Sequence, residues 1–174
     1  MTQPILYMLL GYPGAGKTTA AKIIEKLSGA HRLTSDEERL KRFSTPHFTE
    51  SEHTQLYRQL DDETEELLAS GQSVIYDANL NRYTHRADKY EICRRTNARA
   101  VLIWLDTDRD LSERRSSNIK RQKLWPVGET PQAMFERIAN LIEPPRDNET
   151  PIILDGSALT LAIIKTVLKA HQLI

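Results

Sequence analysis

Short apolar runs alternate with longer amphipathic segments along the 174 residues of the chain. Each run has four to six residues, which suits a strand buried in a sheet better than a helix. The longer segments carry apolar residues at helical spacing. Strands that alternate with helices and short turns predict an α/β fold, in which helices cover both faces of a parallel sheet. The expected strands cover 5–10, 31–34, 73–76, 100–105 and 151–154.

Polar residues with capping side chains mark where several helices should begin. Thr49 followed by Glu52 fits a capping box and opens a helix that should end at Gly71. Asp108 and Ser157 are the expected caps of two later helices, and Thr130-Pro131 should start another. We expect that last helix to run through Leu141 and Ile142 until Pro144-Pro145 closes it. No repeat or linker interrupts the pattern, so a single domain over 1–174 is expected.

The clearest motif follows the first apolar run. Residues 11–18 read Gly-Tyr-Pro-Gly-Ala-Gly-Lys-Thr, a full match to the P-loop pattern G-x-x-x-x-G-K-[ST], and a helical segment follows. Glycines let successive backbone N–H groups converge on a phosphate at a helix N-terminus. Lys17 supplies a charge for the β- and γ-phosphates, and the Thr18 hydroxyl is a candidate Mg²⁺ ligand. The predicted nucleotide-binding residues are Gly11, Pro13, Gly14, Ala15, Gly16, Lys17, Thr18 and Thr19.

A carboxylate follows the second expected strand. Asp36 should lie at the carboxyl edge of the sheet, the edge where the P-loop also lies and where open α/β sheets bind ligands. It could accept the proton of an attacking hydroxyl, while Arg39, one helical turn on, could hold an anionic group. The alternative is a helix N-cap aspartate followed by a solvated turn. Beside a P-loop we favour the catalytic interpretation.

The third expected strand also ends in polar residues. Asp77 could anchor a water bound to Mg²⁺, and Asn79 and Asn81 could orient the acceptor or the loop backbone. The alternative is a turn rich in Asx residues, which need no further reason to be there.

Two basic segments follow, and each could be either functional or simply a solvated helix face. Arg114, Arg115, Lys120 and Arg121 could form a lid, at about 112–128, that closes over ATP, or they could be a solvated helix face. For the basic helix from about Tyr83 to Thr96, which includes Arg86 and Lys89, we expect a solvated face.

Composition narrows the class of protein. Lys plus Arg and Asp plus Glu each total 24, so the net charge is zero, and extensive non-specific binding to nucleic acid is disfavoured. The single cysteine, Cys93, excludes an internal disulfide, and no Cys/His cluster has metal-site spacing. The apolar run at 5–10 is too short for a membrane helix and lacks the features of a signal peptide. We expect a cytoplasmic protein with no membrane and no obligate protein partner.

Three segments together resemble a known family. Residues 11–19, the Ser35-Asp36-x-x-Arg39 motif and residues 73–81 resemble the kinase domain of phage polynucleotide kinase and the small P-loop kinases grouped with it, including zeta-type toxins. The resemblance covers roughly the first two-thirds of the chain. It implies a nucleoside-monophosphate-kinase-like sheet of five parallel strands in the order 2-3-1-4-5.

The resemblance also implies roles for single residues. Asp36 would be the general base, Arg39 would contact the reacting phosphate, and Lys17 and Thr18 would hold phosphate and Mg²⁺. A lid arginine would complete the clamp on the transition state. Leu111-x-x-Arg114 matches the family well, so we assign Arg114 to ATP binding, and the second lid arginine is Arg121 or Arg115, of which we choose Arg121.

A second resemblance concerns the C-terminal third. Residues 134–136, 142–145 and 148–151 are more similar to seryl-tRNA kinase and a related ATPase of the Elongator pathway, which favours an RNA acceptor. ATP is the expected donor, because the Asn/Thr-Lys-x-Asp motif of GTPases is missing. The acceptor stays open between a polynucleotide 5′-hydroxyl, a nucleoside or sugar, and another alcohol. The rival hypotheses are a zeta-toxin-type nucleotide-sugar kinase and an RNA-associated ATPase without kinase activity.

Overall fold

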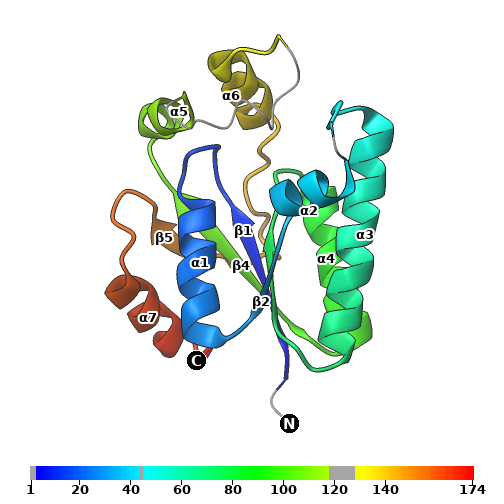
Figure 1. Ribbon diagram of the computed structural model, residues 1–174. Helices are drawn as coiled ribbons and strands as arrows, with labels where there is room; N and C mark the ends of the chain where they lie inside the picture. The colour runs from blue at the N-terminus through cyan, green and yellow to red at the C-terminus, as the bar shows by residue number, and fades with distance from the viewer. Residues whose placement is uncertain (1–2, 44, 118–127) are drawn as a thin grey trace.

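The computed structural model describes residues 3–43, 45–117 and 128–174 of the chain. Five parallel strands form one sheet in the order β2-β3-β1-β4-β5 (Figure 1), which confirms the predicted fold class and strand order. β1 is paired on both sides, with Met8 opposite Tyr76 of β3 and Leu102 of β4. The strands are β1 (Ile5–Leu10), β2 (His31–Thr34), β3 (Val74–Asp77), β4 (Arg99–Asp106) and β5 (Ile152–Asp155).

Helices cover both faces of the sheet, as the near-continuous apolar strands require. α1 (Lys17–Ser28) and α7 (Leu161–Ala170) pack on one face, where Ile24 and Ile164 are fully buried. α3 (Glu50–Ala69) and α4 (Tyr83–Thr96) pack on the other, where Leu56, Leu60 and Ile92 are buried. The remaining helices are α2 (Ser35–Arg42), α5 (Arg109–Ser117) and α6 (Pro131–Ala139).

The remaining three helices lie at one end of the molecule. Parallel strands bring their carboxyl ends to the same edge, so the segments that follow β1, β2, β3 and β4 converge there. In Figure 1, α2, α5 and α6 gather at the end where β1 leads into α1, and both termini lie at the opposite end. Loops at this edge are therefore placed to form a shared site.

The segment after β5 contacts the rest of the fold at both ends of the sheet. At the end with the termini, the Tyr7 hydroxyl donates to the Leu173 carbonyl at 3.1 Å. At the carboxyl edge, Gly156 lies against the P-loop, and an added Cβ there would overlap Ala15 O and Thr107 Oγ1. Only glycine fits this contact between the segment after β5 and the P-loop.

Two expected helix ends differ from the structure, and one expected capping box forms only in part. Ser157 does not cap the last helix, because its N–H and hydroxyl bond Asp155 Oδ1, and Thr160 caps α7 instead by accepting from Ile163 N. Thr49 caps α3 as expected by accepting from Glu52 N at 3.2 Å, but the Glu52 carboxylate accepts from the His47 and Phe48 amides and does not complete the capping box.

α6 ends at Ala139, earlier than the apolar pattern predicts. The Leu141 and Ile142 amides donate to carbonyls three residues back instead of four, which tightens the turn. The next amide, Glu143 N, donates to Asn81 O at 2.8 Å. The helix stops because the chain is pinned to the loop after β3.

The prediction of a solvated basic face on α4 is wrong for two residues. Arg86 is fully buried and Lys89 is almost so. Each has an acidic partner far away in sequence: Glu149 for Arg86 at 2.7 Å, and Asp61 for Lys89 at 2.6 Å. Because those partners lie outside the helix, its own pattern gave no sign of them.

None of the described helices is both long enough and apolar enough to cross a membrane.

Candidate active site

The P-loop has the backbone path that its sequence predicts. Gly14 and Gly16 have φ of 80° and 106°, a left-handed region that residues with a Cβ rarely adopt. The Ala15 amide donates to Tyr12 O at 3.0 Å, and α1 begins at Lys17. The positive end of the α1 dipole therefore faces the space enclosed by the loop.

Lys17 folds back onto this loop. Its Nζ donates to the carbonyls of Gly11 and Tyr12 at 2.7 and 2.8 Å. Burial lowers the pKa of Lys17 to about 8, although the carboxylates of Asp77 and Asp36 oppose that shift. The lysine thus lies close to both carboxylates that the sequence singled out.

Asp77 and Thr18 lie side by side, as a metal site at the phosphates would require. Thr18 Oγ1 donates to Asp77 Oδ1 at 3.4 Å, and Arg32 Nη1 donates to Asp77 Oδ2 at 3.1 Å. Burial raises the pKa of Asp77, and the charges of Arg32 and Lys17 work in the opposite direction. A hydroxyl and a carboxylate are hard oxygen ligands, and Mg²⁺ in such sites takes few protein ligands beside phosphate oxygens and water. These residues fit the ion.

Asp36 lies in the first turn of α2, two residues past the N-cap position at Thr34, so the capping interpretation does not hold. It lines a cavity of about 650 Å³ that also includes Lys17 and Asp77. Its charge acts on Lys17, Asp77 and the buried Tyr57 hydroxyl.

Arg39 is buried beside this cavity with unused hydrogen-bonding capacity. The residue is 7% exposed, and its guanidinium lies 4.9 Å from the Phe48 ring centroid. Nη1 makes no hydrogen bond in the described structure, and its nearest acidic atom is Glu52 Oε2 at 3.9 Å. A buried cation with an unsatisfied donor is a strong site for an anion.

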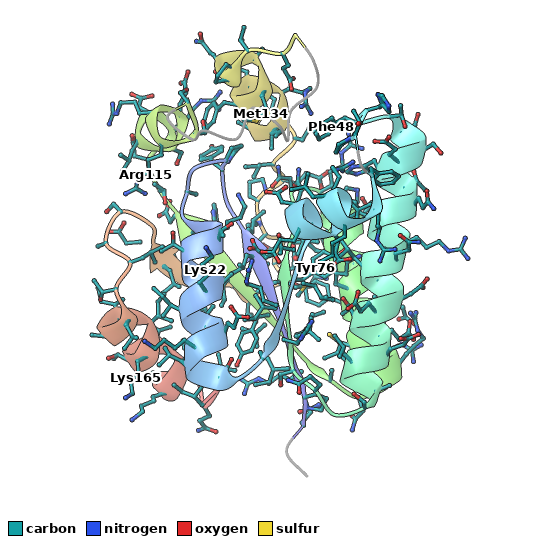
Figure 2. All side chains as sticks on the ribbon, viewed as in Figure 1. Lys22, Phe48, Tyr76, Arg115, Met134 and Lys165 are labelled. Carbon is teal, nitrogen blue, oxygen red and sulfur yellow. The ribbon has the colours of Figure 1, made fainter. Side chains whose placement is uncertain are left out.

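The residues that line the cavity fall into two groups by their place in the fold. Pro13, Gly14, Gly16, Lys17, Thr18, Thr19 and Ser116 line the nucleotide half. The other half, which we call the acceptor half, is lined by Ser35, Asp36, Arg39, Phe48, His53, Tyr57, Ala78, Asn79, Asn81, Met134, Arg137 and Ile138. Asp77 also lines the cavity, next to Thr18. Figure 2 shows Phe48 near the N-terminal end of α3 and Met134 on α6, both at the end of the molecule that holds the P-loop.

Rings dominate one wall of the acceptor half. Phe48 has φ 57°, a left-handed conformation that is unusual for an aromatic residue, and its backbone N–H donates to Glu52 Oε2 at 2.8 Å. His53 and Tyr57 are in contact, with ring centroids 4.3 Å apart. Burial and the charges of Arg39 and His85 lower the pKa of His53, so its ring is neutral near pH 7.

The polar groups of this half are largely engaged with one another. The Tyr57 hydroxyl accepts from Asn79 N at 3.1 Å, and Asn79 Oδ1 accepts from Asn81 N at 3.1 Å. Asn81 Nδ2 donates to Ile138 O at 3.2 Å. Asn79 and Asn81 therefore orient loop backbone, one of the two roles expected for them.

The predicted lid lies only partly within the described residues. Gly14 packs so closely on α5 that an added Cβ would overlap Ser112 O and stand 2.9 Å from Ser116 N. Arg115 Nη1 donates to Gly156 O at 2.9 Å, whereas Arg114 is exposed and does not line the cavity. Lys120 and Arg121 lie outside the described residues, so the role of Arg121 stays a prediction.

Several cavity residues were missed from sequence. Met134, Arg137 and Ile138 come from α6, and Phe48, His53 and Tyr57 come from α3 and the residue pair before it. Gly11 and Ala15, predicted as nucleotide-binding, belong to the P-loop without lining the cavity. Arg32, the partner of Asp77, was also missed, because nothing in a single strand marks which cation will face a distant carboxylate.

Known proteins resemble this chain in family and in fold. Residues 6–145 match the family model AAA_33, described as AAA domain. None of the curated proteins matches the chain.

Solved structures share the fold at low identity. An unliganded sugar kinase from Janibacter sp. HTCC2649 has 18% identity, covers 99% of this chain and 96% of its own, and has a TM-score of 0.66. The Mycobacterium tuberculosis APS kinase in complex with AMPPNP and APS has 18% identity, coverage of 99% and 98%, and a TM-score of 0.66. A chain of the Pnkp1/Rnl/Hen1 RNA repair complex has 20% identity and a TM-score of 0.64, over 81% of this chain and 45% of that one. Because the family model spans more than half of the sequence, the protein belongs to the AAA domain family AAA_33, and its sheet has the fold of P-loop kinases.

Proposed function

We propose that the protein transfers the γ-phosphate of ATP to a hydroxyl group. The observation that carries the proposal is the shared cavity: Asp36 and Arg39 line the same space as Lys17 and Thr18. A P-loop serves many ATPases, but a carboxylate and an unsatisfied buried arginine beside it suit a second substrate that must lose a proton. The APS kinase of similar fold, solved with AMPPNP and APS, holds a nucleotide and an acceptor together.

The proposed reaction follows from the positions of these groups. When ATP binds, Lys17 gives up its hydrogen bonds to the loop carbonyls and bonds β- and γ-phosphate oxygens instead. The P-loop amides hold the β-phosphate. Thr18 and Asp77 would hold Mg²⁺, which neutralises charge on the phosphates when bound. Asp36 takes the proton of the acceptor hydroxyl, the oxygen attacks the γ-phosphorus, and the bond to the ADP oxygen breaks. Arg39 stabilises charge on the transferred group.

We further propose a base-bearing acceptor, such as a polynucleotide 5′-hydroxyl or a nucleoside. The Tyr57 hydroxyl, Asn79 Oδ1 and Asn81 Nδ2 already bond backbone groups, while the rings of Phe48, His53 and Tyr57 line the same half. Ring faces are left, and bases stack on such faces at about 1–3 kcal/mol each. The likeness to a chain of an RNA repair complex points the same way.

Two alternatives remain as outcomes of the test. A sugar or nucleotide-sugar acceptor has the support of the similarity to a sugar kinase. An RNA-associated ATPase would need no general base for an acceptor hydroxyl. Replacing Asp36 therefore distinguishes this ATPase from a kinase.

The experiment compares wild type with Asp36→Asn, first screening RNA, DNA, nucleosides and sugars with γ-labelled ATP. Asparagine is nearly isosteric, so the fold and ATP binding should persist. Transfer should fall about 10²–10⁴-fold, the usual loss when general base help is removed. Unchanged transfer would remove Asp36 as the base. Hydrolysis of ATP with no acceptor labelled would favour the ATPase instead.

A further inference from the structure

The largest fully buried side chain lies outside the cavity, on α4. Arg86 is 0% exposed, and an arginine has five N–H donors. Nε and Nη2 donate to the two carboxylate oxygens of Glu149 at 2.7 and 2.8 Å. Nη1 donates to the carbonyls of Leu80 and Asn81 at 3.1 and 3.2 Å, and Nη2 also donates to Pro144 O at 3.3 Å. All five donors are thereby engaged.

Glu149 is equally well satisfied. Besides Arg86, Oε1 accepts from the Tyr90 hydroxyl at 2.9 Å and Oε2 accepts from Arg146 N at 3.0 Å. Burial alone would raise the pKa of Glu149, but the bonds from Arg86, Arg146 and Tyr90 outweigh it and hold the pKa below its usual value. The pair is therefore ionised at neutral pH.

The pair joins the loop after β3, which lines the acceptor half, to the segment that follows α6, the helix whose Met134, Arg137 and Ile138 line it. Leu80 and Asn81 belong to the loop after β3, and Pro144 belongs to the segment after α6. Further bonds run in parallel: Asn81 Nδ2 to Ile138 O at 3.2 Å, Glu143 N to Asn81 O at 2.8 Å, and Tyr83 N to Glu143 Oε2 at 3.1 Å. The loop after β3 and the end of α6 are held at a fixed separation.

Stability alone is a poor explanation for such a pair. Removing two charges from water is costly, and apolar pairs of similar volume often serve a fold equally well. What an apolar pair cannot supply is a rigid fork aimed at three backbone carbonyls. We propose that Arg86 and Glu149 are positioning residues, which set the distance between the loop after β3 and α6 and so the shape of the acceptor half. This inference rests on the proposed phosphotransfer.

The test uses the double variant Arg86→Met/Glu149→Leu, which removes both charges while keeping the volume apolar. Arg95→Met is the matched control, because Arg95 is on the same helix and its pair with Glu65 is exposed. Four quantities are measured: thermal midpoint, ATP affinity, acceptor kcat/KM, and hydrogen exchange of the Glu143 and Asn81 amides.

Positioning predicts a specific combination in the double variant. The thermal midpoint and ATP affinity stay near wild type, the two amides exchange faster, and acceptor kcat/KM falls about 10–100-fold, the scale expected for an ångström of misplacement. Arg95→Met behaves as wild type throughout. Arg86→Lys keeps the positive charge but loses the planar guanidinium. If this variant folds, its acceptor kcat/KM should fall as well.

The contrary results are separable. Normal transfer in a folded double variant overturns the positioning role and leaves the proposed function intact. If the double variant fails to fold, a folded Arg86→Lys protein with wild-type transfer overturns the positioning role in the same way. A wild-type protein that labels no acceptor refutes the proposed function, and the inference falls with it.

Discussion

The two halves of the cavity are built in different ways. The nucleotide half comes mainly from one contiguous segment, 11–19, and it relies on backbone N–H groups and a helix terminus. The acceptor half draws side chains from α2, α3, α6 and the loop after β3. The first needs a particular backbone path, and the second needs particular side chains held by distant partners. The difference teaches that one half is encoded locally and the other by tertiary contacts.

Lys17→Ala is the sharpest way to break the nucleotide half, because Lys17 is the one cationic side chain among the described residues that line that half. Turnover of ATP, with or without an acceptor, should fall by at least about 10³-fold, the scale of a cation that stabilises the transferred phosphoryl group. Lys22→Ala, an exposed position on the same helix, is the control. A folded Lys17→Ala protein with wild-type turnover would contradict the P-loop assignment.

Phe48→Leu should damage only the acceptor half. It removes the ring beneath Arg39 and one face for a stacked base, worth about 1–3 kcal/mol, so acceptor KM should rise roughly 5–150-fold. ATP affinity should not change. Steady-state kinetics against Leu40→Ala, which alters an exposed residue of α2, checks this. Equal acceptor KM in wild type and Phe48→Leu would count against the stacking wall.

Acid should weaken the Arg86–Glu149 pair, which holds the acceptor half, and the expected effect on stability is smaller. The pKa of Glu149 is below its ordinary 4.5, so its contribution to stability is complete above pH 4.5 and is lost as pH falls through the lowered pKa. The stability gap between wild type and Glu149→Gln should therefore be constant above pH 4.5. Below it, the gap should narrow by at most about 1.4 kcal/mol per pH unit.

Denaturant titrations from pH 7 to pH 3 measure that gap. A gap that does not change with pH would mean that Glu149 keeps an ordinary pKa in the folded protein.

Sequence predicted those features that local rules determine. The strands and the P-loop followed from apolar runs and one motif, whereas the strand order followed from the resemblance to small P-loop kinases. Asp36 and Asp77 could be placed because parallel strands share a carboxyl edge. Arg86 could not, since a helical arginine reads as solvated until Glu149, 63 residues later, is known to face it. The early end of α6 was equally hidden, because the Asn81 carbonyl that pins Glu143 lies on another segment.

The contact of Gly156 with Ala15 bears on how the protein can be divided. Sequence similarity to the family ends at residue 145, yet the chain beyond it supplies Glu149, an outer strand of the sheet and the glycine that supports the P-loop from behind. A fragment cut at 145 would expose the edge of β4 and the apolar side of α1. The limit of recognisable similarity is therefore not a structural boundary, because the last 29 residues complete the sheet and pack against the P-loop.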